Sequence, residues 1–134
     1  MGAAMAPAAA DTIAQHLQDF NRTPDDYDLI VTGDLGVVGS DILVKLMQEN
    51  GYNIAGVHND CGKLIFDIEA QDFHSGARGC GSCGSVFCGH VYKLLKQKKL
   101  KKVLLMATGA LMNSMSVQQG ESIPAIAHAL TIEA

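Results

Sequence analysis

Two short, uninterrupted apolar runs limit the folds that this chain can adopt. They are Leu29 to Thr32 and Val103 to Ala107, each flanked by charged or turn-forming residues. Such runs are typical of strands buried on both faces of a sheet, because a strand with one face in water alternates apolar and polar residues. Both faces of the sheet must then be covered by helices. The sequence therefore predicts an α/β fold.

The segments around these runs carry helical and strand patterns in alternation. Ile13, Leu17 and Phe20 share one helical face, which indicates an opening helix. Pro7 suits the first turn of that helix, which should end near Asn21. The other expected elements are a helix capped by Ser40 and stopped at Gly51, a strand from Lys63 to Ile68, a helix from Val86 to Leu95, and a closing strand from Ile126 to Ile132.

Length and charge narrow the class of protein further. With 134 residues and 48% hydrophobic content, the chain should form a single domain over residues 1–134. A net charge of −4 argues against general binding to nucleic acid, and the lysines between Lys93 and Lys102 are expected to solvate a helix end. No apolar run approaches the roughly 20 residues that span a bilayer, so we expect a soluble, intracellular protein with free thiols.

Glycines and cysteines are concentrated between Ser75 and His90, just before a helical pattern. The glycines allow the backbone to approach a ligand closely, and unpaired N–H groups at a helix start attract anions. Cys80 and Cys83 form a C-x-x-C pair with Cys88 behind them, so a thiol redox site and a structural metal site both remain open. Thiols that only pack in a core are a third possibility.

Histidines and strand-following loops complete the candidate groups. His58, His74 and His128 suit acid–base work or ligand contact, and structural roles explain them equally well. Loops after strands are the expected ligand positions in an α/β fold, here Gly33 to Gly36 and Thr108 to Ser122. The second loop is long and rich in hydrogen-bond donors, which favours a functional role.

Four stretches of the chain carry a family resemblance. They are MGAAMAPAAADTI at the start, YDLIVTGDLGVVGSDIL (Tyr27 to Leu43), NDCGKLIFD (Asn59 to Asp67) and ATGALMNSMSVQQGESIPAIAHA (Ala107 to Ala129). Over almost the whole chain they resemble the C-terminal part of the stage V sporulation protein AD family. The resemblance implies a thiolase-like half, a mixed sheet covered by helices. It also implies a role in handling dipicolinic acid, pyridine-2,6-dicarboxylate, during spore formation.

The same resemblance implies that three catalytic positions of thiolases and related condensing enzymes have changed. Arg78 stands where thiolases carry a histidine in an H-P-x-G-x-x-G stretch, and Gly33 stands where condensing enzymes carry another. Thr108 falls near a thiolase cysteine, and none of the four cysteines inherits the first-half nucleophile by position. His74 is close enough in sequence to replace part of the lost imidazole. We therefore expect ligand binding without acyl transfer.

The expected function is a non-catalytic module that binds dipicolinic acid, or its calcium complex, for uptake into the developing spore. A bidentate guanidinium at Arg78 suits a planar dicarboxylate, although an exposed loop arginine explains that residue equally well. No resident cofactor or metal is expected. The residues expected to line the site are His74, Arg78, Gly79, Cys80, Gly81, Thr108, Gly109, Ser114, Gln118 and Gln119.

Two alternative functions stay open. The resemblance also allows an acyl-CoA-processing subunit of thiolase type, and the pair Cys80 and Cys83 allows a thiol redox or metal protein. A thiolase half buries one face against the other half, so this chain should expose an apolar surface and self-associate. The resemblance implies an N-terminal half and other stage V sporulation A proteins as partners. It implies a cytoplasmic or forespore location, peripheral to the inner spore membrane.

Overall fold

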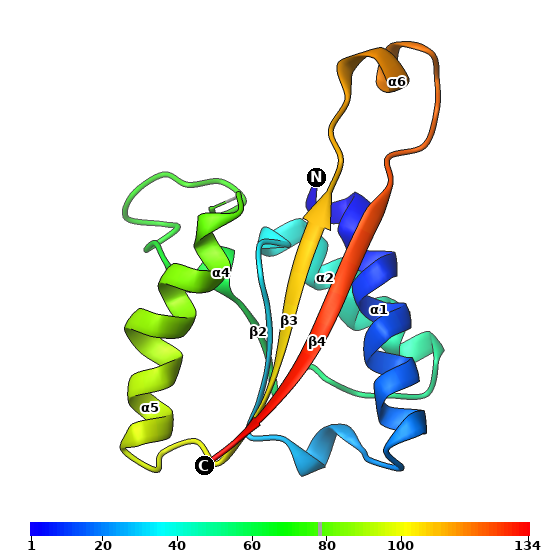
Figure 1. Ribbon diagram of the computed structural model, residues 1–134. Helices are drawn as coiled ribbons and strands as arrows, with labels where there is room; N and C mark the ends of the chain where they lie inside the picture. Colours follow the sequence, from blue (N-terminus) through cyan, green and yellow to red (C-terminus); the bar gives the residue numbers. More distant parts are fainter. Residues whose placement is uncertain (78) are drawn as a thin grey trace.

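The computed structural model describes residues 1–77 and 79–134 (Figure 1). Helices and strands alternate along most of the chain, which confirms the predicted α/β class. The strands are β1 (Leu29–Thr32), β2 (His58–Asp60), β3 (Lys102–Ala110) and β4 (Ala125–Glu133). The helices are α1 (Gly2–Asp19), α2 (Gly36–Glu49), α3 (Cys61–Leu64), α4 (Gly81–Val86), α5 (Tyr92–Lys96) and α6 (Ser114–Gln118), with a 3-10 turn η1 (Pro24–Asp26) and a π-helical turn η2 (Phe87–Val91).

The four strands form one mixed sheet in the order β2-β1-β3-β4. β1 is parallel to β2, with Thr32 opposite Asp60, and parallel to β3, with Thr32 opposite Met106. β4 returns antiparallel to β3 along the whole length of both strands. The carboxyl ends of β1, β2 and β3 therefore point to the same end of the sheet, where α/β proteins place their ligands.

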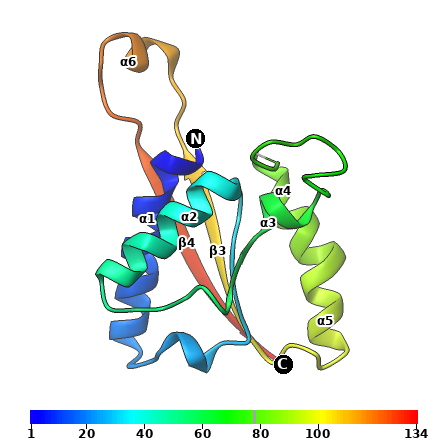
Figure 2. The same ribbon diagram turned by 180° about the vertical axis from the view of Figure 1, so that it is seen from behind.

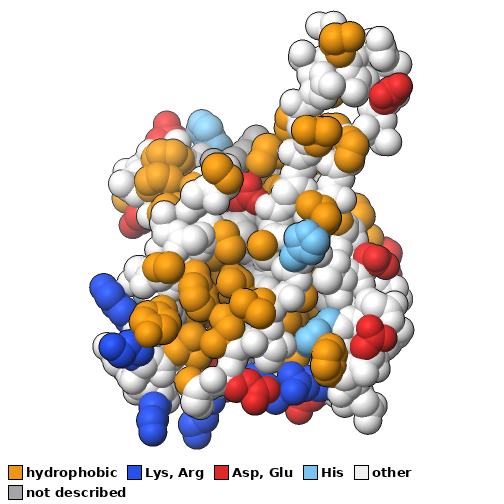
Figure 3. Space-filling view, viewed as in Figure 1, with side chains coloured by type: hydrophobic (Ala, Val, Ile, Leu, Met, Phe, Trp, Pro, Cys, Tyr) orange, Lys and Arg blue, Asp and Glu red, His pale blue; other side chains and the backbone are white. Residues whose placement is uncertain are grey.

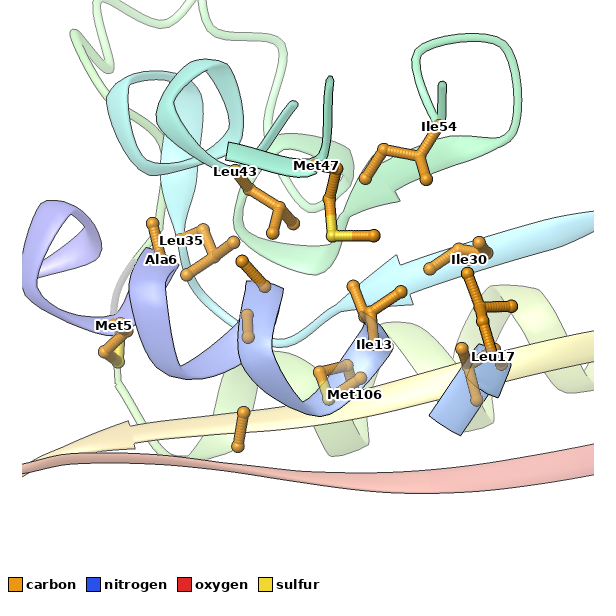
Figure 4. Packing of buried hydrophobic residues seen from close by; sticks show 14 of the residues in the cluster. Met5, Ala6, Ile13, Leu17, Ile30, Leu35, Leu43, Met47, Ile54 and Met106 are labelled. Atoms are coloured by element: carbon orange, nitrogen blue, oxygen red, sulfur yellow. The ribbon is translucent and has the colours of Figure 1, made fainter. Parts of the chain in front are cut away.

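Helices α1 and α2 cover one face of the sheet (Figures 1 and 2). The larger hydrophobic core lies beneath them, and its side chains come from both helices and from three strands. Figure 4 shows Leu17 of α1 beside Ile30 of β1, and Ile13 of α1 beside Met106 of β3. Burying a side chain of this size contributes about 1.5–3 kcal/mol. This cluster is therefore a main source of the stability of the fold.

The consecutive turns of α4, η2 and α5 cover part of the other face of the sheet. There Val86, Val91 and Leu95 are buried against Val31 of β1 and Val103 of β3. β1 thus has buried side chains on both of its faces, as its continuous apolar run predicts.

The described helices leave the rest of that face uncovered (Figure 3). Ala127 of β4 is buried in the core that α1 covers. Since side chains alternate along a strand, Ile126, His128 and Leu130 lie on the opposite face. Leu130 is 58% exposed and pairs across the strands with Leu105 of β3. We call the area formed by Leu105, Ile126, His128 and Leu130 the open sheet face.

β3 and β4 run on beyond the helices into an arm that carries α6 at its tip (Figures 1 and 2). In both views the arm stands apart from the segment that leads into α4. The apolar side chains of Leu111, Met115 and Val117 on the arm are at least half exposed. Exposed apolar side chains gathered in this way are typical of a contact surface.

Two predicted helix starts are wrong. α1 begins at Gly2, so Pro7 lies in its interior and not in its first turn. A Cβ on Gly2 would lie 1.9 Å from the carbonyl oxygen of Leu35, so glycine lets this extra turn pack tightly against the start of α2. α2 begins at Gly36, and Ser40 lies inside the helix instead of capping it.

The predicted strand from Lys63 to Ile68 is also wrong. β2 lies earlier, at His58–Asp60, and Cys61–Leu64 forms the short helix α3. Asp60 caps α3 by accepting a hydrogen bond from the backbone N–H of Gly62. The cap turns the chain before the residues whose pattern predicts a strand.

The other predicted boundaries agree closely with the structure. α1 ends at Asp19, near the expected Asn21. Gly51 follows the end of α2 with a φ of +86°, the left-handed conformation expected of a helix stop. The predicted strands near Val103 and Ile126 correspond to β3 and β4. Among the described residues, no helix is both long enough and apolar enough to cross a membrane.

Candidate functional site

The candidate site lies where β1, β2 and β3 end. The loop after β1 carries Asp34, β2 ends at Asp60, and Thr108 lies near the end of β3. Both carboxylates are almost completely buried, with exposed fractions of 4% for Asp34 and 0% for Asp60. A buried carboxylate is stable only when hydrogen-bond donors surround it, so the contacts of these two groups define the site.

Asp60 holds the loop after β1 in place. Its Oδ1 accepts hydrogen bonds from the Thr32 hydroxyl at 2.5 Å and from the Leu35 N–H at 2.9 Å. Its Oδ2 accepts from the N–H groups of Gly36 at 2.9 Å and Gly62 at 3.0 Å. Burial raises the pKa of Asp60 above the ordinary carboxyl value, and these four donors oppose that rise. The carboxylate thereby ties together the starts of α2 and α3.

His58 extends this network as a neutral imidazole. Burial, with a smaller effect from the positive charge of Lys63, lowers the pKa of His58 to about 4. Its Nε2 lies 3.0 Å from the Thr32 hydroxyl oxygen. The Thr32 hydroxyl donates its proton to Asp60, so it can only accept from His58. The single N–H of the neutral imidazole therefore lies on Nε2 and donates to the Thr32 oxygen. The histidine therefore has a structural partner.

Asp34 binds the groups that were predicted to hold a ligand. Its Oδ1 accepts from the Thr108 hydroxyl at 2.7 Å, and its Oδ2 accepts from the Gly79 N–H at 3.0 Å. The Asp34 N–H in turn donates to the Thr108 hydroxyl oxygen at 3.1 Å. Two predicted ligand-binding positions are thus brought together, around a carboxylate that the sequence analysis did not select.

Two of the three positions that the thiolase resemblance identifies as changed, Gly33 and Thr108, lie close together. A Cβ on Gly33 would lie 3.0 Å from the Thr108 hydroxyl oxygen and 3.5 Å from Cβ of Cys83. Gly33 therefore leaves room where Thr108 and α4 approach the loop. The third changed position, Arg78, lies outside the described residues, and its neighbour Gly79 binds Asp34.

The Cys83 thiol interacts with the buried Cys61 thiol. The buried Cys61 thiol donates a hydrogen bond that lowers the pKa of Cys83, and the same bond, with burial, raises the pKa of Cys61. Cys80 is exposed, and so is Cys88. The described residues contain no group of three or more histidine, cysteine or acidic side chains placed to hold a metal ion.

Most of the other predicted site residues are exposed. His74 is exposed, with its Nδ1 3.7 Å from a carboxylate oxygen of Asp72. Ser114, Gln118 and Gln119 are exposed at the tip of the arm (Figure 1). Cys80 and Gly81 are exposed at the start of α4, and Gly109 lies in β3.

The comparisons with known proteins identify the family of this chain. The family model described as stage V sporulation protein AD matches residues 1–133. The curated stage V sporulation protein AD of Bacillus subtilis (strain 168) is 50% identical to this chain over 133 residues. The match covers 99% of this chain and 39% of the relative, so the chain spans well under half the length of that protein. The chain belongs to the stage V sporulation protein AD family.

Proposed function

We propose that this chain is a thiolase-like sporulation module that holds dipicolinic acid as its calcium complex and catalyses no reaction on it. The observation that carries the proposal is the contact between Gly33, Asp34 and Thr108. At the positions where the thiolase resemblance calls for reactive side chains, the chain has a glycine and a threonine whose hydroxyl is bonded to Asp34. The hydrogen bond fixes the oxygen atoms of Thr108 and Asp34 in positions where they can bind a ligand.

The histidines support a binding role. Acyl transfer of the thiolase type needs an imidazole within hydrogen-bonding reach of the reacting thiol. His58 is engaged with Thr32, and the exposed His74 lies beside Asp72. Among the described residues no histidine is hydrogen-bonded to the Thr108 hydroxyl, whose partner is Asp34.

The charge of Asp34 favours the calcium complex over the free dianion. A dipicolinate dianion beside this carboxylate would be repelled in a site of low dielectric constant. Calcium takes about six to eight oxygen ligands, more than one dipicolinate supplies, so carboxylate oxygens fill the remaining positions. Each oxygen of Asp34 has two lone pairs, so it can keep its bond to Thr108 or Gly79 and still bind the ion.

Isothermal titration tests this proposal. The chain is mixed with the remaining part of the Bacillus subtilis relative and titrated with dipicolinate, calcium, and both together. We expect saturable binding only with both, and Asp34→Asn should weaken it about tenfold, because one charged ligand of the ion is lost. Asp25→Asn, at an exposed aspartate in η1, should bind as the unchanged chain does. A folded mixture that shows no saturable heat under any of the three conditions contradicts the proposal.

We also propose that the open sheet face is the contact surface for the other half or for a second copy. Its apolar side chains are exposed on the part of the sheet face that α5 leaves uncovered (Figure 3). Other stage V sporulation A proteins at the inner spore membrane are the proposed cellular partners, with this module bound peripherally.

Sedimentation velocity measures this association directly. At micromolar concentration the chain alone should sediment as a dimer or a larger species, because association covers the exposed leucine and isoleucine. Leu130→Lys should shift it to the monomer, since a charge would enter the contact. Val38→Lys, at an exposed valine of α2 on the other side of the sheet, is the matched control and should leave the distribution unchanged. A monomeric unsubstituted chain would refute self-association.

A further inference from the structure

We propose that the chain has a second small-molecule site, a cavity between α2 and the β2–α3 segment that binds carboxylates with an apolar body. The cavity has a volume of about 540 Å³, within the range of about 300–1,000 Å³ that is usual for small-molecule sites. It shares no lining residue with the site around Asp34 and Thr108. Its lining is Val38, Ser40, Asp41, Ile42, Val44, Lys45, Ala55, His58 and Lys63.

The walls of the cavity suit an apolar body. Val38, Ile42 and Val44 come from α2, and Ala55 comes from the segment that leads into β2. Val38 is 54% exposed, although it lies on a helix whose other apolar side chains are mostly covered. A short aliphatic chain between these side chains would remove apolar surface from water, which supplies affinity without specificity.

The charges of the cavity select an anion. Lys45 and Lys63 approach it from different elements, and Asp41 is the one acidic group in the lining, which leaves one net positive charge. His58 is neutral at pH 7 because burial lowers its pKa to about 4. Within the described part of the chain neither lysine forms an ion pair, so both ammonium groups remain available to a carboxylate.

A buried hydroxyl provides an independent reason to expect a ligand. Ser40 lines the cavity, is 2% exposed, and its Oγ has no hydrogen-bond partner among the described residues. A buried polar atom without a partner costs free energy that a ligand atom removes. Alanine would fill this helical position without that cost, so the hydroxyl is better explained by binding than by folding.

An NMR titration of the folded chain with octanoate at pH 7 tests the proposal. We expect saturable shifts of backbone amides in α2 and around Lys63. Acetate, which lacks the apolar body, and octanol, which lacks the charge, should each bind at least about fivefold more weakly. Lys63→Gln should weaken octanoate binding by about fivefold, whereas Lys96→Gln on α5 should leave it unchanged.

Ser40→Ala separates binding from folding. This variant should bind octanoate more weakly while its thermal midpoint stays the same or rises, because the substitution removes a hydroxyl that has no partner in the folded chain. Equal binding of octanol and octanoate overturns the proposal, and so does a Lys63→Gln variant that binds as tightly as the unchanged chain. Shifts confined to the open sheet face would also overturn it.

Discussion

Replacing Asp60 with asparagine should lower the free energy of unfolding by about 3 kcal/mol or more. The carboxylate is completely buried and accepts from one hydroxyl and three backbone N–H groups. An asparagine keeps one acceptor oxygen and turns an NH₂ group toward donors, which leaves at least one buried N–H group without a partner, and two if the NH₂ replaces Oδ2. Since a domain of this size is stable by about 5–15 kcal/mol, the loss should be visible in urea unfolding followed by circular dichroism.

Asp28 provides a matched control for this substitution. It also accepts two backbone hydrogen bonds, from Lys101 N–H at 2.7 Å and from Lys102 N–H at 2.9 Å, but it is exposed. Water can replace a lost acceptor there, so Asp28→Asn should cost about 1 kcal/mol at most. A loss for Asp60→Asn no larger than for Asp28→Asn would show that burial of the Asp60 carboxylate contributes little.

Two of the strands that the sequence predicts correctly, β1 and β3, have side chains buried on both faces. Ile30 and Val31 point to opposite cores, and this is why the run from Leu29 to Thr32 is continuously apolar. β2 has no such pattern, because its three residues are His58, Asn59 and Asp60. Its strand conformation comes from pairing with β1, and a pairing between distant segments cannot be predicted from the local sequence pattern.

The site is less predictable because its contacts join distant parts of the chain. Asp34 and Thr108 are 74 positions apart and meet only because β1 and β3 are neighbours in the sheet. The family resemblance selects Gly33 and Thr108, but it does not reveal that Asp34 binds between Thr108 and Gly79. The sequence alone does not distinguish a buried aspartate from an exposed one. Only the tertiary structure shows that Asp34 is buried.

The arm shows a second limit of sequence-based prediction. Loops after strands hold ligands, and the segment from Thr108 to Ser122 was expected to help build the site. β3 instead continues to Ala110 and pairs with β4 from Ala125 onward, which carries Ser114 and Gln118 away from Thr108. The length of a strand depends on its pairing with the partner strand, so the sequence of one strand alone does not predict where it ends.

Replacing Gly36 with alanine should lower the free energy of unfolding by about 3 kcal/mol, and the same substitution at Gly51 should cost only about 1–2 kcal/mol. Both glycines have positive φ, +68° and +86°. A Cβ on Gly36 would lie 2.2 Å from the carbonyl oxygen of Ser75, whereas nothing lies within 4 Å of one on Gly51. The difference between the two losses of stability therefore measures the cost of the clash with Ser75, because the backbone strain of a positive φ is common to both variants.

The contact at Gly36 also links stability to the candidate site. The Val37 N–H donates to the same Ser75 oxygen at 2.9 Å, so this oxygen cannot move away without losing a hydrogen bond. The Gly36 N–H donates to Asp60 as well, and a displaced Gly36 would loosen the loop that carries Asp34. Chemical unfolding of the two variants measures the difference, and calcium–dipicolinate titration should show weaker binding for Gly36→Ala alone. Equal losses of stability would mean that the segment at Ser75 yields freely and does not hold the loop after β1.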